Sequence, residues 1–512
     1  MMDMTVAPPE REVGSGEGPW ELPAAWCWAP LRSLTSFIGR GRGPKYVEEH
    51  GVPVVNQKCI RWRKLATQHL RLTARDAFDR LTPELILRQG DLLWNSTGTG
   101  TIGRAVVYDG SIGELTVDSH VTIVRPVGIE PKYLGYFVET GRVQHLVDEA
   151  HVGSTNQREL PRAFVEDLLL PLAPFSQQRR IVASIDALFA EIAEGETAIE
   201  EARKGLETFN RALLKAAVTG ELTSVWREKN KPTETGRDLL ARLKAQRAAQ
   251  ISTGRRKRAQ ETEPLDTTDL PELPEGWAWA PVADVGSVQL GRQRAPQHHQ
   301  GENMHSYLRV ANVFEDRIDR NDVKKMNFTP AELKTFELTP GDILLNEGQT
   351  PDLLGRPAMW RSDERGFCFQ NTLLRFRAFE PLDPEFCLLV FRHYLHAKRF
   401  KRESQITTNI AHLSSGRFST IEFPVPPIEE QKEIVRLTQE GLASAADTRI
   451  LLDSQLADAP RLRQAILKSA FEGKLVDQDP DDEPASVALA RLRAAPSRAT
   501  PRRGRIRAVR EP

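Results

Sequence analysis

The sequence has few cysteines and no long apolar run. Its 512 residues include only Cys27, Cys59, Cys368 and Cys387, and no two of them form a CxxC motif. This spacing predicts neither a disulfide framework nor a metal site. A membrane span needs about 20 consecutive apolar residues, and no stretch approaches that length. These absences favour a protein of the reducing cytoplasm that is not anchored in a membrane.

Motifs for common catalytic chemistry are also absent. The chain holds no Walker lysine loop, no Asp/Asn-Pro-Pro-aromatic methyltransferase motif, no HExxH and no nucleophile elbow. The first residues lack the basic and apolar blocks of a signal peptide, and they predict a disordered leader. The formal net charge is zero, so a nucleic acid would have to be bound through local basic patches.

One glycine-rich segment has the spacing of a nucleotide-binding loop. Gly98, Gly100 and Gly103 form GxGxxG, which cradles phosphates when it follows a strand and opens a helix. The residues after it, RAVVYDGSIGELTVDSHVTIVRP, are rich in β-branched types and contain an Asp-Gly turn, so they predict strands. We therefore expect a tight surface loop. An enzyme that binds a nucleotide through residues 98–103 is the alternative.

Several segments occur twice, about 251–253 residues apart. GDLLWN at 90–95 matches GDILLN at 341–346, and LPAAWCWAP at 22–30 matches LPEGWAWAP at 273–281. PLAPFSQQRRIV pairs with PVPPIEEQKEIV, and LLKAAVTGEL pairs with ILKSAFEGKL, at nearly the same offset. The chain is therefore two copies of one unit. The glycine spacing is not repeated, because the second copy has EGQTPDLLGR there. A variable loop on a repeated scaffold is typical of a recognition surface.

Each copy is expected to end in a long helix. After Pro174, apolar residues alternate at steps of four and three, a coiled-coil seam over about 40 residues or roughly 60 Å. The seam residues are Ile181, Ile185, Leu188, Ile192, Ile199, Leu206, Phe209 and Leu213. The second copy has a poorer seam, with Leu452, Leu462 and Ile466, and Pro460 is expected to kink or break that helix. Two long helices from a duplicated unit are expected to pack antiparallel.

The expected fold class is α+β, with two similar mixed α/β domains separated by an antiparallel pair of coiled-coil helices and related by a pseudo-two-fold internal repeat. The expected order is a disordered leader (1–19), a first domain (20–174), a spacer helix (175–220), a short helix with a polar linker (221–272), a second domain (273–427), a second spacer helix (428–476), a short helix (477–495) and a basic disordered tail (496–512).

Both domains concentrate positive charge, which favours a DNA surface over solvated basic faces. Base contacts need side chains that present hydrogen-bonding forks in a groove, while phosphate contacts mostly position the protein. The candidates in the first domain are Arg40, Arg42, Lys45, Arg61, Arg63, Asn95, Thr97, Thr99 and Arg104. Those in the second are Arg292, Arg294, His298, Glu347, Gln349, Arg356, Lys398 and Arg399. The other interpretations are a coiled-coil scaffold without a DNA role and, for Asn95 and Asn346, a turn-capping role.

The duplicated motifs, in this order, resemble the specificity subunits of type I restriction-modification systems. The resemblance covers about residues 20–495 and implies that each globular part is a target recognition domain for one half of a split double-stranded DNA site. It also implies that the helices set the gap between the two half-sites and dock two modification (methyltransferase) subunits. Restriction (endonuclease and translocase) subunits would join this complex. Adenine-N6 methylation and cleavage, with S-adenosylmethionine, ATP and Mg, would then belong to those partners, and this chain would hold no cofactor. Pro460 and the weak second seam depart from the family pattern.

Overall fold

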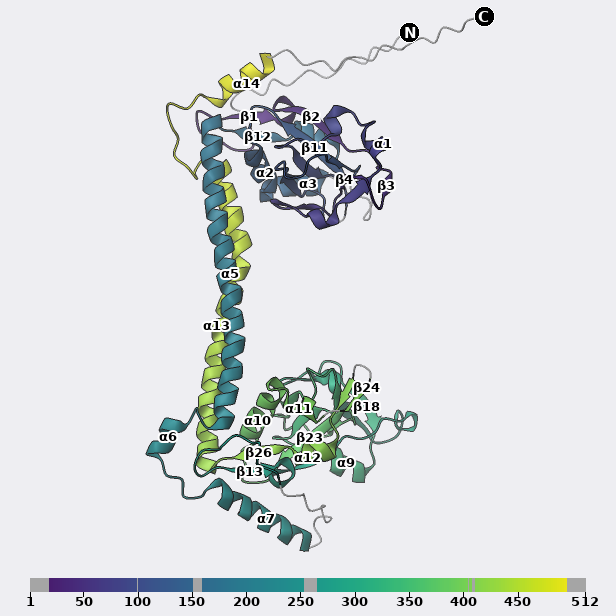
Figure 1. Ribbon diagram of the computed structural model, residues 1–512, viewed down its shortest axis with the longest axis vertical. Coiled ribbons are helices and arrows are strands. Elements are labelled where there is room, and N and C mark those ends of the chain that lie inside the picture. The colour runs from purple at the N-terminus through teal and green to yellow at the C-terminus, as the bar shows by residue number, and fades with distance from the viewer. Residues whose placement is uncertain are drawn as a thin grey trace, which may run out of the picture. The chain divides into compact units, whose positions relative to one another are not determined.

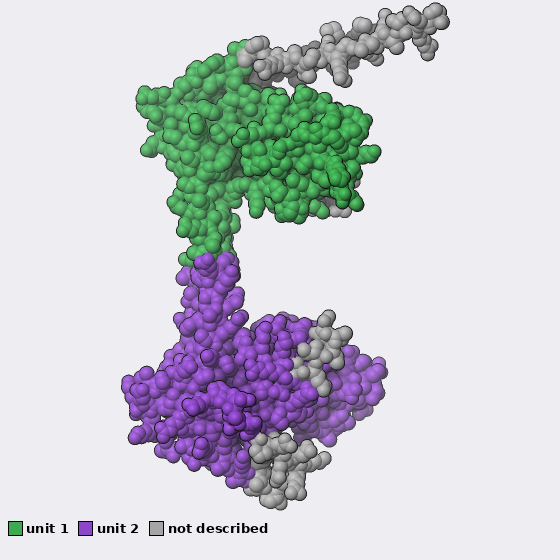
Figure 2. Space-filling model, viewed as in Figure 1, with its two compact units in different colours: residues 1–198, 454–512 green, residues 199–453 purple. Residues whose placement is uncertain are grey.

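The chain forms two compact units, which consist of residues 1–198 with 454–512 and of residues 199–453 (Figures 1 and 2). The computed structural model describes residues 18–98, 100–150, 159–252, 265–403, 405–407 and 410–494. Each unit contains one globular domain and part of each long helix. The expected leader up to residue 17, the expected tail and the candidate Thr99 lie outside the described residues.

The domain of the first unit is built on a four-stranded antiparallel sheet. Its strands, in spatial order, are β2 (Thr35–Arg40), β11 (Val121–Pro126), β8 (Leu92–Asn95) and β9 (Ala105–Val107). A second sheet contains β10 (Thr116–Val117), β4 (Val52–Val55), β7 (Arg71–Thr73) and β3 (Tyr46–Val47). The opening strand β1 (Cys27–Pro30) pairs with β12 (Leu169–Leu172), and helix α2 (Pro131–Glu139) contacts β9.

The domain of the second unit repeats this arrangement. Its main sheet has the order β14 (Gly286–Leu290), β23 (Leu373–Ala378), β19 (Ile343–Asn346) and β21 (Pro357–Met359). The opening strand β13 (Ala278–Pro281) pairs with β26 (Glu422–Val425), as β1 does with β12. Helix α10 (Pro384–His396) takes the place of α2. The expected α+β fold of two similar domains is therefore confirmed.

The repeated Gly-Asp motif forms a buried ion pair in each domain. Asp91, just before β8, accepts two hydrogen bonds of 2.7 and 2.8 Å from Arg125 of β11. Asp342, just before β19, accepts two bonds of 2.5 and 2.6 Å from Arg377 of β23. Because each guanidinium binds both carboxylate oxygens, the charge of the buried carboxylate is compensated. The motif thus ties together the two central strands of each sheet.

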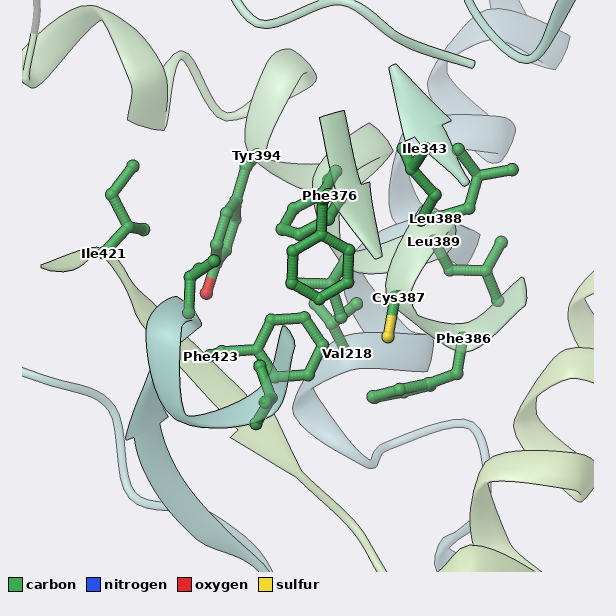
Figure 3. Close-up of a cluster of buried hydrophobic side chains, with 14 of the residues drawn as sticks. Val218, Ile343, Phe376, Phe386, Cys387, Leu388, Leu389, Tyr394, Ile421 and Phe423 are labelled. Atoms are coloured by element: carbon green, nitrogen blue, oxygen red, sulfur yellow. The ribbon is translucent and has the colours of Figure 1, made fainter. Parts of the chain in front are cut away.

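The repeated tryptophans lock each domain to the start of a long helix. Trp26 donates its indole N–H to Gln177 at 2.8 Å, and Trp277 donates to Glu430 at 2.9 Å. Both tryptophans are buried. In the second unit the surrounding core also takes in Val218 from the end of the first long helix, beside Phe376 and Phe423 (Figure 3).

The two long helices are α5 (Phe175–Thr219) and α13 (Ile428–Phe471), and they pair within each unit (Figure 1). In the first unit Arg463 donates two hydrogen bonds to Glu196. In the second unit Arg203 pairs with Asp453, and Leu213 lies against Gly441. Residue numbers rise along one helix as they fall along the other, so the pairing is antiparallel. Helix α13 continues through Pro460, so the expected break is wrong.

The seam between the helices is more polar than the apolar pattern predicts. Ile181 and Ile185 are buried, and the other predicted residues are half-buried: Leu188, Ile192, Ile199, Leu206, Leu213, Leu452 and Ile466. Phe209 and Leu462 are 47% and 52% exposed, so their assignment to the seam is wrong. The neighbouring residues Asn210 and Arg463 occupy the half-buried positions instead.

A short helix follows each long helix and packs on the domain of the other copy. The segment expected to hold one short helix contains two, α6 (Ser224–Lys229) and α7 (Gly236–Ser252), and α7 contacts β13 and β26. Near the end of the chain, α14 (Ala485–Ala494) contacts β1. LARLKA at 240–245 in α7 corresponds to LARLRA at 489–494 in α14, a repeat that the sequence analysis missed. Of the helices described, none is long and apolar enough to cross a membrane.

The two Asp–Arg pairs differ in solvent exposure, which predicts unequal costs of mutation. Arg125 has 10% of its side chain exposed and Arg377 has 40%, while both carboxylates are buried. We expect Asp91→Asn to lower the free energy of unfolding of the first unit by about 3–5 kcal/mol, because it leaves a buried guanidinium uncompensated. Asp342→Asn should cost less, since water can solvate Arg377. Hydrogen exchange resolved to peptides measures both, with the exposed pair variant Glu166→Gln as control.

Candidate DNA interface

The loop with GxGxxG spacing joins two strands of the main sheet. It runs from the end of β8 to the start of β9, and Gly98, Gly100 and Gly103 have φ values of 106°, 72° and 86°. The glycines therefore allow left-handed backbone in a tight turn. A strand and not a helix follows, so no helix N-terminus faces the loop, and the nucleotide-binding alternative loses its geometric basis. The equivalent loop of the second domain joins β19 to β21.

The repeated asparagine holds this loop from inside. Asn95 is fully buried, and its side-chain amide donates to the carbonyls of Gln57 and Thr101 at 3.1 and 3.2 Å. Its predicted role as a DNA contact is wrong, because the side chain faces the fold. Asn346 is buried at the same place in the second domain. In both copies the asparagine carbonyl also accepts a backbone bond across the loop, from Gly103 and from Gly355.

Four of the predicted basic contacts are used by the fold. Arg40 pairs with Glu159 and donates to the carbonyl of Leu160 at 2.6 Å. Arg292 is 7% exposed, and it binds Glu332 and the carbonyl of Asn327. The remaining two are Arg63, which pairs with Glu139, and Arg399, which pairs with Glu403 and Glu422. Their positive charge is compensated internally, so these four residues stabilise the fold, and their contact with DNA stays a prediction.

The other predicted polar residues make local contacts. Thr97 bonds His120 at 2.7 Å, and His298 lies 3.1 Å from Arg292. In the second domain, three more side chains contact their neighbours: Glu347 with His412, Gln349 with the backbone N–H of Thr350, and Lys398 with Asp352. These contacts neither require nor exclude a bound ligand, so the five residues stay predictions.

A second group of basic side chains has no carboxylate partner within the described residues. Arg42 and Lys45 are exposed and line a hollow of about 380 Å³. Arg61 and Arg104 are half-buried, and Arg61 bonds only the carbonyl of its neighbour Ile60. In the second domain Arg294 contacts only His299. Because their charge is uncompensated, these side chains are available to phosphate.

A short hairpin places part of this group beside the loop. Strands β5 (Ile60–Arg61) and β6 (Lys64–Leu65) pair with each other and contact β9, directly after Arg104. The same hairpin in the second domain is formed by β16 (Val313–Phe314) and β17 (Arg317–Ile318), which contact β21 directly after Arg356. Hairpin and loop therefore form one surface at the same end of each main sheet.

The hairpins also show residues that the sequence analysis missed. The guanidiniums of Arg317 and Arg356 lie 4.3 and 4.9 Å from the ring centroid of Phe314. Burial lowers the pKa of Arg356, and no carboxylate in the described structure pairs with it. Lys64 takes the position of Arg317 in the first domain and is exposed. The two hairpins are 253 residues apart, as the internal repeat predicts, but their sequences are too different for this correspondence to be recognised from the sequence alone.

Comparison with known proteins gives one consistent result. Residues 275–439 match the family model described as "Type I restriction modification DNA specificity domain". The chain is 22% identical over 474 residues to the Type I restriction enzyme EcoKI specificity subunit of Escherichia coli (strain K12), which covers 90% of this chain and 91% of that protein. It is 23% identical over 481 residues to the StySPI specificity subunit of Salmonella potsdam, with shares of 90% and 91%.

Two solved structures share the fold over most of the chain. The HsdS subunit from Thermoanaerobacter tengcongensis has a TM-score of 0.56 at 18% identity, and the match covers 90% of this chain and 99% of that one. A chain from a structure that describes complex assembly and conformational transition of the type I R-M system has a TM-score of 0.59 at 17% identity, with 89% and 100% covered.

The family model matches the second copy, and the first copy repeats its strand order and its buried Asp–Arg pair. The chain is similar to the specificity subunits of type I restriction-modification systems over 90% of its length. For a specificity subunit, the uncompensated cations beside the variable loops are the natural candidates for contact with DNA.

The division into compensated and free cations predicts different effects of mutation. We expect Arg104→Ala and Lys45→Ala each to weaken binding to duplex DNA and to reduce the slope of log K against log salt by about one. Arg292→Ala should instead lower the stability of the second unit. Fluorescence anisotropy over a series of salt concentrations measures the slope.

Arg162→Ala is the matched control for these variants, because Arg162 is exposed and already pairs with Glu166. Equal slopes for Arg104→Ala, Lys45→Ala and this control would contradict the proposed surface.

Proposed function

We propose that this specificity subunit reads a bipartite double-stranded DNA site, with one half read by each domain. The observation that carries the proposal is the duplication itself: two domains share one scaffold but differ in the loop between the central strands. In the first domain Arg104 of the loop and Arg61 of the adjacent hairpin have no carboxylate partner in the described structure, and in the second domain the same is true of Arg356 in the loop. The chain acts in the cytoplasm and recognises sequence for catalytic partners.

Two short half-sites require a fixed gap to be specific. Each wrong base pair costs about 1–3 kcal/mol, so a half-site of a few base pairs discriminates weakly. Two half-sites joined by a rigid element add their penalties and also require the correct separation. Helices α5 and α13 each contribute to both units, which supports their role as the element that sets the gap.

Equivalent apolar side chains on the long helices support the docking of two modification subunits. Phe209 of α5 and Leu462 of α13 occupy the same position in the two copies, and about half of each side chain is exposed. Ile450 and Leu451 are also exposed on the second unit's part of α13. Exposed large apolar residues at repeat-related positions suit two copies of one partner. Methyltransferase chemistry with S-adenosylmethionine, and ATP- and Mg-dependent cleavage by restriction subunits, belong to the partners.

A coordinated deletion tests the role of the helices. Removal of residues 193–199 and 457–463 takes one heptad from each helix and removes Glu196 together with Arg463. At 1.5 Å per residue this shortens the pair by about 10 Å, or about three base pairs of B-DNA. We expect the gap between methylated half-sites to change by about that amount. Sequencing of methylated adenines in cells that express the modification subunit measures it.

Two results would separate this model from its rivals. Unchanged half-site sequences with an altered gap support it, and a matched seven-residue deletion of 254–260, outside the long helices, should leave the gap as it was. Altered half-site sequences with the original gap would contradict the role of the helices without contradicting DNA recognition.

Substitution of a charged residue at the exposed apolar positions of the long helices tests whether modification subunits dock there. We expect Phe209→Glu and Leu462→Glu each to remove one bound modification subunit, and the double variant to remove both, because a carboxylate cannot be desolvated against an apolar partner surface. Light scattering of the purified complex gives the stoichiometry. Val487→Glu, an exposed apolar position on α14, is the control. Two bound subunits in the double variant would contradict the assignment.

A further inference from the structure

The hairpin in each domain is attached to its helix by an ion pair, and the two pairs have opposite polarity. In the first domain Arg63 of the hairpin lies 3.2 Å from Glu139 at the end of α2. In the second domain Asp316 of the hairpin lies 3.2 Å from Arg392 of α10. Both pairs join residues at an offset of 253, so each position carries the opposite charge in the other copy.

The backbone geometry shows that these positions are equivalent. Ile60 pairs with Leu65 in the first hairpin as Val313 pairs with Ile318 in the second, with a two-residue turn between the inner pair. The second turn residue has a left-handed backbone in both, with φ of 61° at Arg63 and 52° at Asp316. The same turn thus presents a cation in one copy and an anion in the other.

Each pair also contacts other aromatic or charged side chains of its own unit. Arg63 also lies over the ring of Phe189 of α5, at 4.8 Å. Burial raises the pKa of Glu139, and the charges of Arg63 and Arg463 oppose that rise. In the second domain Arg361 also donates to Asp316, at 2.9 Å, so the anion has two arginine partners. At the contact position, the helix of the other copy presents the same charge as the hairpin: Arg392 for Arg63, and Glu139 for Asp316.

We propose that this inverted polarity keeps each hairpin on the helix of its own copy. Two copies of one domain in a single chain are present at high effective concentration, and exchange of equivalent elements is a common misfolding route of duplicated proteins. An exchanged hairpin would set Arg63 against Arg392, or Asp316 against Glu139. Both arrangements place like charges at a partly buried contact, so exchange is disfavoured within a chain and between chains.

The proposal is tested with four versions of the full chain. The first is the natural protein. The second carries Arg63→Asp with Glu139→Arg, and the third carries Asp316→Arg with Arg392→Glu. In each of these two versions the pair between hairpin and helix is retained with its charges reversed, so both copies have the same polarity. The swaps also oppose like charges locally, Arg463 to residue 139 in the second version, and Arg361 and Glu315 to residues 316 and 392 in the third. The fourth carries all four substitutions, so that the polarities differ again. Each chain is refolded from denaturant at several protein concentrations, and recovered monomer is measured by size-exclusion chromatography with light scattering.

We expect the second and third versions to give less native monomer and more exchanged dimer, by about fivefold, and the fourth to recover toward the natural protein. Recovery in the fourth version is decisive, because purely local damage would add up and make it the worst of the four. Additive losses, or equal monomer recovery in all four, would overturn the proposal. The exposed pair swap Arg162→Glu with Glu166→Arg is the control for charge rearrangement as such.

A second measurement covers the case in which a version folds poorly. Hydrogen exchange of the purified monomers reports the native stability of each hairpin separately from refolding yield. Lower yield with unchanged exchange at residues 60–65 and 313–318 supports the proposal. Lower yield that follows faster exchange in the substituted hairpin alone contradicts it.

Discussion

The architecture depends on how each long helix begins. In the second unit the buried carboxylate of Glu430 accepts hydrogen bonds from Trp277, Thr223 and Arg227. These donors come from the opening of the domain and from the chain that follows α5, so one side chain joins the start of one helix, the end of the other and the domain. In the first unit Gln177 takes the same place and accepts from Trp26. This junction ties the geometry of each domain to that of the helices.

The duplicated scaffold separates what must stay constant from what can vary. The Asp–Arg pairs and the tryptophan bonds recur because each copy needs the same strands and the same helix junction. The loop after β8 is held from inside by the side-chain amide of Asn95, and in both domains a backbone bond to the asparagine carbonyl closes the loop. Its outward side chains can therefore change without loss of the fold. Arg61 and Arg104, beside this loop, have no carboxylate partner in the described structure, whereas Arg40 and Arg399 are compensated by nearby carboxylates.

The sequence predicted the repeat and the long helices, because these depend on spacing and residue type. It did not separate Arg40 from Arg42, since the difference lies in a partner, Glu159, which is distant in sequence. It also placed Phe209 in the helix seam in preference to Asn210, because an apolar pattern favours the aromatic residue. Asn210 occupies the half-buried position, because packing against the partner helix determines which side chains of α5 are covered. The sequence pattern therefore could not predict contacts between distant segments.

The position of the last helices has a consequence for synthesis. Phe471, at the end of α13, packs between Tyr133 and Phe137 of the first domain, and α14 covers β1. The first domain to leave the ribosome therefore lacks part of its core until the final segment of the chain has been translated. In the second domain the corresponding segments are the end of α5 and helix α7. Both are translated before the strands of that domain. The first domain is thus begun before the second and completed after it, so a stop between residues 454 and 471 would truncate the first unit alone.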